Sequence, residues 1–200
     1  MRRFLQWLVV CWLLAGAAAA PGASIESYAG KISSLVDPAK LQTLGERGAN
    51  PRVQKYVALL SEAKAEGLKP EKVAKQAVSA VGMKGEAAKL TIKAMVENLG
   101  IAEKSGCTDA EGLHDMRRGQ APTVRKGDHR GDQLSVDHVI PRSVVPELDK
   151  VIANLELVPL KGNEEKSDKV GKRQIELGRK LRKAGLLSKA GLRALEERGS

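Results

Sequence analysis

The sequence predicts an α+β protein in which a bundle of helices precedes a small unit of two strands and a helix. Three observations support this prediction. Apolar residues recur at helical spacing in the first half of the chain, they alternate in two short stretches of the second half, and a long basic helical stretch follows. We assign the bundle to residues 24–119 and the second unit to residues 120–200.

Residues 1–23 belong to neither unit and have the three parts of a secretory signal peptide. Arg2 and Arg3 form a basic start, an apolar run follows from 4 to 14, and small residues then offer cleavage positions. A retained membrane anchor is the alternative, but the apolar run is short for a span of about 20 residues. We therefore expect a secreted or periplasmic mature chain with no stable membrane span.

Composition restricts the partners of the mature chain. Removing the leader leaves Cys107 as the only thiol and two tyrosines as the only aromatic residues. A lone cysteine cannot form an internal disulfide, and two aromatics cannot build a base-stacking platform. The formal charge is +10, or about +8 without the two leader arginines, which favours a polyanionic partner held through its phosphates. A zinc site from Cys107, His114 and His129 is a weaker alternative, because the spacing is irregular.

The bundle is predicted from apolar spacing and from its punctuation. Prolines or glycines stand at the starts and glycines at the ends of three expected helices, 51–67, 70–82 and 85–100. Thr108 and Glu111 have the spacing of a capping box, which predicts a fourth helix over 108–119. No convergent polar cluster occurs in this half of the chain, so we expect a module that serves packing or docks a protein partner and has no chemistry of its own.

The second unit carries the chemistry-bearing residues. Residues 134–140 and 154–160 alternate as strands, and helical sequence follows from 163. Along this strand, loop, strand and helix, Asp137 and His138 come first, Asn154 follows, and Asn163 and Lys166 lie at the expected helix start.

The stretches "VDHVIPRS", "NLELVPL" and "NEEKSDKV" resemble, in order and spacing, the HNH endonucleases with their ββα-metal domain. The resemblance covers roughly residues 130–172. It implies that Asp137 and Asn163 are metal ligands, that His138 is the general base, and that Asn154 steadies the loop and the base. The chain departs from the family in lacking the two C-x-x-C pairs of a structural zinc, so no structural zinc is expected.

The residue types fit phosphodiester hydrolysis on physical grounds as well. A neutral imidazole, His138, can take a proton from water near neutral pH. Carboxylate and amide oxygens from Asp137 and Asn163 suit a hard ion, Mg²⁺ or Mn²⁺. Neighbouring strand residues point to opposite faces, so Asp137 and His138 share one site only if the strand end twists or breaks. Basic residues around the site are candidate phosphate contacts: Arg142, Lys166, Lys172 and Arg173.

These observations lead to two hypotheses of different class. The first is a secreted, metal-dependent HNH endonuclease that cuts DNA with little sequence specificity. The second is a non-catalytic secreted protein that binds DNA or another polyanion on a decayed HNH fold. Cleavage of plasmid DNA with and without EDTA distinguishes the two.

Overall fold

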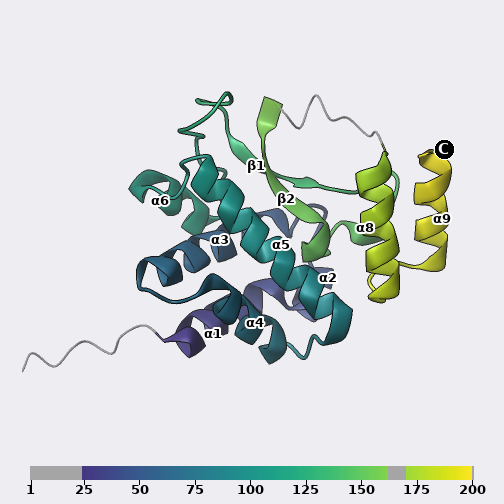
Figure 1. Ribbon diagram of the computed structural model, residues 1–200, viewed down its shortest axis with the longest axis horizontal. Coiled ribbons are helices and arrows are strands. Elements are labelled where there is room, and N and C mark those ends of the chain that lie inside the picture. Colours follow the sequence, from purple (N-terminus) through teal and green to yellow (C-terminus); the bar gives the residue numbers. More distant parts are fainter. Residues whose placement is uncertain (1–23, 162–169, 200) are drawn as a thin grey trace, which may run out of the picture.

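The computed structural model describes residues 24–161 and 170–199 (Figure 1). The leader 1–23 and two predicted site residues, Asn163 and Lys166, therefore lie outside the described residues. The helices and strands follow in the order α1 (Ile25–Val36), α2 (Pro38–Gln42), α3 (Asn50–Ala65), α4 (Pro70–Ala80), α5 (Gly85–Lys104), α6 (Ala110–Arg118), β1 (Leu134–His138), η1 (Pro146–Leu148), η2 (Ile152–Asn154), β2 (Leu155–Pro159), α8 (Lys172–Lys183) and α9 (Lys189–Arg198).

The α+β class is confirmed in coarse form, because helices dominate and one antiparallel sheet of two strands accompanies them. Helices α3, α4 and α5 begin within one residue of their predicted starts. Gly67 and Gly82 have the left-handed φ values, +81° and +73°, that end a helix. Gly100 was wrongly predicted as a helix end, since α5 continues to Lys104. The cap of α6 is Asp109, whose side chain accepts from the Gly112 N–H, and not Thr108.

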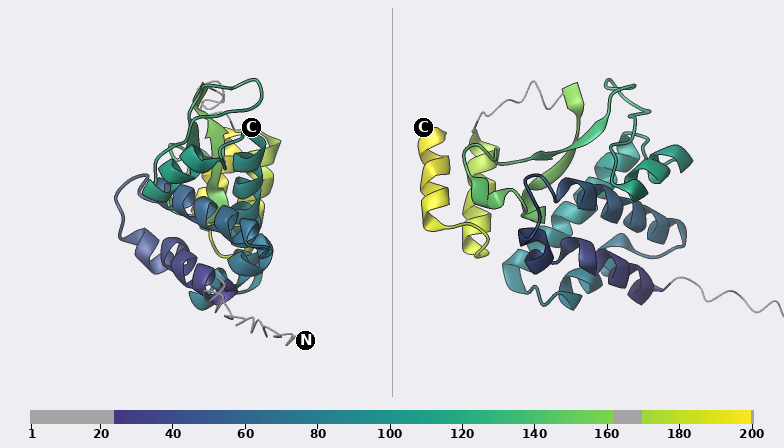
Figure 2. Two further views of the ribbon diagram at one scale, coloured as in Figure 1. Left: turned by 90° about the vertical axis from the view of Figure 1, so that its left-hand side faces the viewer. Right: turned by 180° about the vertical axis from the view of Figure 1, so that it is seen from behind.

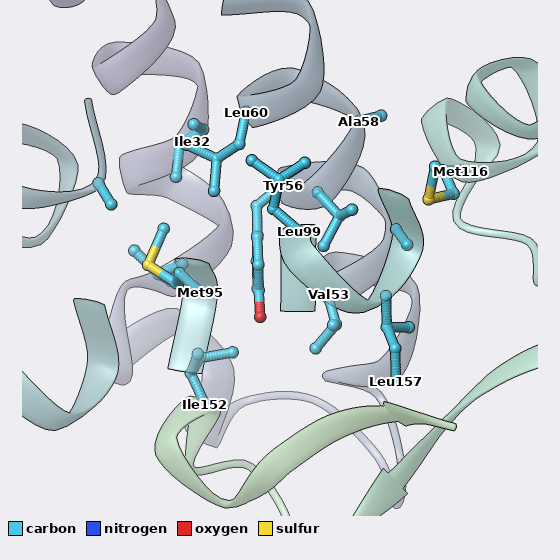
Figure 3. Close-up of a cluster of buried hydrophobic side chains, with 14 of the residues drawn as sticks. Ile32, Val53, Tyr56, Ala58, Leu60, Met95, Leu99, Met116, Ile152 and Leu157 are labelled. Atoms are coloured by element: carbon cyan, nitrogen blue, oxygen red, sulfur yellow. The ribbon is translucent and has the colours of Figure 1, made fainter. Parts of the chain in front are cut away.

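The bundle and the hairpin share one hydrophobic core. Tyr56 of α3 lies at its centre, among side chains of the neighbouring helices and of the hairpin (Figure 3). Leu134, Leu155 and Leu157 of the two strands belong to the same buried cluster as the helices. Residues on both sides of the predicted boundary at 119/120 thus pack in one core, so the boundary separates two parts of the sequence but not two separately packed units.

A second, smaller core lies at the opposite end of the hairpin from α6. Helices α8 and α9 lie side by side there, as Figure 1 and the right-hand view of Figure 2 show. Leu181 and Leu195 of these helices pack on Ile140 and Leu148, which belong to the connection between the strands. The basic C-terminal helices are thereby fixed to the loop that follows β1.

Three amide side chains of the bundle fix the hairpin through its backbone. On α3, the Asn50 Nδ2 donates to the Val136 carbonyl at 3.2 Å, and the Gln54 Nε2 donates to the Leu134 carbonyl at 2.8 Å. These bonds give hydrogen-bond partners to carbonyl groups on the edge of β1 that faces away from β2. On α5, Asn98 donates to the Leu155 carbonyl at 3.0 Å and accepts from the Leu157 N–H at 2.7 Å.

No helix among the described residues is both long enough and apolar enough to span a bilayer.

Candidate functional site

The predicted site lies where β1 ends. The strands pair in antiparallel register, with Asp137 opposite Glu156 and His138 opposite Leu155. Burial alternates along β1, so the side chain of His138 points to the buried face of the hairpin and that of Asp137 points to the opposite face. Because pairing continues through His138, the strand does not break between the two residues. A phosphate contacted by both would have to lie at the end of the strand, where the two faces meet.

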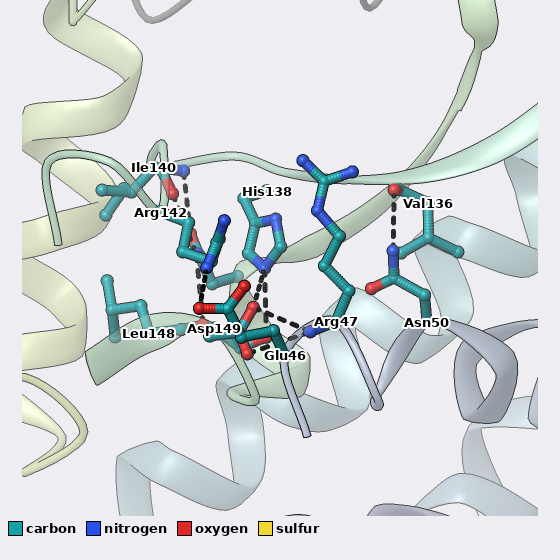
Figure 4. A network of polar contacts seen from close by, with 10 residues as sticks. Glu46, Arg47, Asn50, Val136, His138, Ile140, Arg142, Leu148 and Asp149 are labelled. Atoms are coloured by element: carbon teal, nitrogen blue, oxygen red, sulfur yellow. Dashed lines mark hydrogen bonds and ion pairs between the residues drawn. The ribbon is translucent and has the colours of Figure 1, made fainter. Parts of the chain in front are cut away.

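Asp149, in the loop that follows β1, contacts the His138 ring through two of its oxygens. Its side chain is almost completely buried, and its Nε2 lies 3.0 Å from the carbonyl oxygen of Asp149 and 3.1 Å from the Asp149 Oδ1 (Figure 4). A carbonyl oxygen can only accept a hydrogen bond, so we assign the proton of the neutral ring to Nε2. In this tautomer, Nδ1 is the nitrogen that can accept a proton.

Asp149 is a functional candidate that the sequence analysis missed. It is 7% exposed, and besides contacting His138 its carboxylate accepts from the backbone N–H of Arg47, at 3.2 and 3.4 Å. Arg47 lies in the loop between α2 and α3, 102 residues earlier in the chain. An acid 11 positions after a histidine has no recognisable spacing, so nothing in the sequence indicated this contact.

Two further contacts, one from this loop and one from the last residue of α2, reach the segment after β1. Glu46 pairs with Arg142 at 2.7 Å, and the Lys150 Nζ donates to the Gln42 carbonyl at 3.4 Å. The segment that carries Asp149 is thus fixed from the bundle side, as Figure 4 shows for Glu46 and Arg142. The bundle therefore forms one wall of the candidate site.

Asn154 braces the loop between the strands from inside. Its side chain is fully buried, its Oδ1 accepts from the Ile140 N–H at 2.8 Å, and its Nδ2 donates to the Ile140 carbonyl at 3.1 Å. A longer bond of 3.5 Å runs to the Leu148 carbonyl. Both ends of the amide are used for bracing, so Asn154 acts on the site through the position of the loop.

The predicted phosphate contacts differ in their surroundings. Arg142 pairs with Glu46, and Arg173 of α8 pairs with Glu156 of β2, with 3.1 Å between Nη1 and Oε1. The hydrogen bond to Glu156 raises the pKa of Arg173. Lys172, next to Arg173, is exposed. Exposed ion pairs contribute little stability, so Arg142, whose partner Glu46 is largely exposed, can exchange this carboxylate for a phosphate at low cost.

The oxygen ligands available to a metal lie on the outer face of the hairpin. Asp137 and Glu156 are cross-strand neighbours there, and Glu156 is engaged by Arg173. Carboxylates suit Mg²⁺ or Mn²⁺, which keep several waters and need only one or two protein carboxylates. Within residues 24–161 and 170–199, no three His, Cys, Asp or Glu side chains gather as a metal-binding group. Asp137 with Asn163 therefore stays a prediction.

Cys107 is a buried, unpaired thiol away from this site. Its Sγ contacts the carbonyl oxygens of Ser105 and Thr123, and burial raises its pKa to about 11. A thiol is a poor metal ligand while it keeps its proton, so these surroundings suit a packing role.

Comparison with known proteins gives no match to a family model, to a curated protein or to a solved structure.

Proposed function

We propose that this protein is a metal-dependent endonuclease of the HNH type that hydrolyses phosphodiester bonds of DNA. The observation that carries the proposal is the setting of His138 at the end of β1. Its Nε2 is held by the backbone carbonyl of Asp149, and the loop that supplies this carbonyl is braced by the buried amide of Asn154. A histidine fixed through one nitrogen presents the other as a base in a defined direction.

In the proposed reaction, the Nδ1 of His138 takes a proton from the attacking water. The oxygen of that water bonds to phosphorus as the bond to the departing 3′-oxygen breaks, and the departing oxygen receives a proton from solvent. Asp137, with Asn163, would hold Mg²⁺ or Mn²⁺, which when bound offsets negative charge on the phosphate. The oxygen donor set of Asp137 fits such an ion.

The charge of the chain supports DNA as the substrate. From Lys169 to Ser200 the sequence has ten Lys and Arg against three Glu, and the described part of this segment forms α8 and α9 beside the site. Phosphate contacts give affinity without reading the bases, so little sequence specificity is proposed. The predicted leader supports the periplasm or the medium as the location. We also propose that the bundle binds a protein partner, and this part rests on the sequence alone.

The burial of His138 favours a second candidate, a non-catalytic protein that binds DNA or another polyanion. The ring is only 5% exposed, and a base must reach the attacking water. In this alternative, the contact between His138 and Asp149 serves packing alone, and the basic helices hold the polyanion.

One experiment separates the two candidates. The mature chain and its His138→Ala variant are incubated with supercoiled plasmid, with Mg²⁺, Mn²⁺ or EDTA, and DNA binding is measured in parallel. Nicking by the parent chain that needs the metal and is lost in the variant supports the nuclease. Binding without any cleavage in either metal refutes it and leaves the polyanion-binding protein.

A further inference from the structure

The loop between α2 and α3 holds an arginine in a backbone conformation that suits glycine. Arg47 has φ +53°, and among the described residues it is the only one other than glycine with a positive φ. The left-handed region costs an ordinary L-residue roughly 1–2 kcal/mol, whereas glycine enters it freely. Such conformations gather at functional sites, where the surrounding structure holds them.

The contacts of the loop show what this conformation achieves. It points the Arg47 N–H at the carboxylate of Asp149, the residue that contacts His138. The neighbouring ion pair between Glu46 and Arg142 fixes the loop on the same segment. The Asp149 carboxylate therefore contacts both the backbone of Arg47 and the candidate base, His138.

The side chain of Arg47 leaves this anchor toward the site. Figure 4 shows it extending past the ring of His138 to the level of β1, with its guanidinium beyond the ring. The residue is exposed, and within the described part of the chain no hydrogen bond or ion pair of its guanidinium is found. Arg142 and Arg173, two of the four phosphate contacts predicted from the sequence, are by contrast each paired with a glutamate.

We propose that Arg47 binds a phosphate of the DNA strand at the His138 site, so that the helical bundle supplies a substrate-binding residue. This inference rests on the proposed function. A guanidinium binds phosphate oxygens through two parallel N–H bonds, and a fixed backbone reduces the entropy lost when these bonds form. The left-handed backbone of Arg47 brings its N–H to the Asp149 carboxylate and directs its side chain toward the site. We take this arrangement as the reason why the strained conformation is kept.

The test uses Arg47→Gly, which removes the guanidinium and keeps both the N–H and the left-handed backbone. Its matched control is Lys72→Ala, which removes one exposed cation from α4, a helix with no extensive contact to the hairpin. Binding of a labelled DNA duplex is measured in EDTA over a range of salt, and cleavage is measured in Mg²⁺. Thermal unfolding of each variant is followed by circular dichroism.

We expect Arg47→Gly to weaken binding roughly tenfold at low salt and to reduce the salt slope by about 0.9. The thermal midpoint should stay unchanged or rise. Lys72→Ala should bind DNA like the parent. Arg47→Lys should bind DNA more tightly than Arg47→Gly but more weakly than the parent, since lysine keeps the positive charge without the two parallel N–H donors of the guanidinium. Should Arg47→Gly match Lys72→Ala in binding and cleavage, the inference is wrong while the proposed function stands. A parent chain that neither binds nor cuts DNA overturns both.

Discussion

Replacing Asn154 by alanine should loosen the site without touching any reacting group. The side chain is fully buried and forms three hydrogen bonds to backbone groups of the loop. Alanine leaves the N–H and the carbonyl of Ile140 without these partners, in a place that water does not reach. The loop that supplies the Asp149 carbonyl to His138 then loses its internal brace.

The expected cost follows from the bond lengths. The two bonds to Ile140, at 2.8 and 3.1 Å, have good geometry, and the third, at 3.5 Å to Leu148, is long enough to count for little. A buried polar group left without its partner costs about 1–3 kcal/mol, so two of them cost about 2–6 kcal/mol. Since domains of this size are stable by only about 5–15 kcal/mol, the loss should be large.

Urea unfolding followed by far-ultraviolet circular dichroism measures this change in the free energy of unfolding. Ser143→Ala is the matched control, because Ser143 is exposed in the same loop and its loss should change stability by less than about 0.5 kcal/mol. Asn154→Ala should also lower cleavage of DNA under conditions in which it remains folded. A loss below about 1 kcal/mol would refute the bracing argument, because it would mean that the orphaned groups find other partners.

The remaining predictions concern the reaction and the thiol. His138→Ala should lower turnover by roughly two to four orders of magnitude while DNA still binds, and a variant that cuts as fast as the parent would contradict the base assignment. Asp137→Ala should raise the concentration of Mg²⁺ or Mn²⁺ needed for half-maximal cleavage, with partial rescue at high metal; an unchanged metal requirement would exclude Asp137 as a ligand. Because burial raises the pKa of Cys107 to about 11, the native chain should react with iodoacetamide at neutral pH far more slowly than the urea-unfolded chain. The raised pKa also makes the free energy of unfolding depend on pH. The contribution of the protonated thiol to stability is fully present below pH 9.0, the pKa of the thiol in the unfolded chain, and it should be lost as the pH rises toward 11. Unfolding measured at a series of pH values tests this.

Local patterns were enough to predict most elements of this chain. The helices around Tyr56 and Met95 follow apolar spacing and terminal glycines, and both strands follow alternation. These signals work because a helix or strand is selected by residues close in sequence. Two boundaries were wrong, at Gly100 and Thr108, where the packing of α5 and the better-placed carboxylate of Asp109 decide the outcome. Helices α1, α2 and α9 had no predicted range, and α8 begins at Lys172, although helical sequence was expected from 163.

The candidate site divides in the same way. Asp137, His138 and Asn154 could be selected from the sequence because they lie within one hairpin, at fixed positions relative to strands that the alternation predicts. Their partners could not. Asp149 has no spacing that marks it, and Arg47 reaches the site from the bundle, 102 positions before Asp149. Contacts between side chains so far apart depend on how the chain closes on itself.

The sequence by itself therefore determined the bundle followed by the hairpin, the basic charge and three residues of the candidate site, Asp137, His138 and Asn154. Only the tertiary structure decided that the bundle and the hairpin share a core, that Asn50, Gln54 and Asn98 hold the strands, and that His138 is fixed by Asp149. The physical reason is that residues near in sequence select φ and ψ, whereas the burial of apolar surface and the pairing of buried polar groups depend on segments brought together in space.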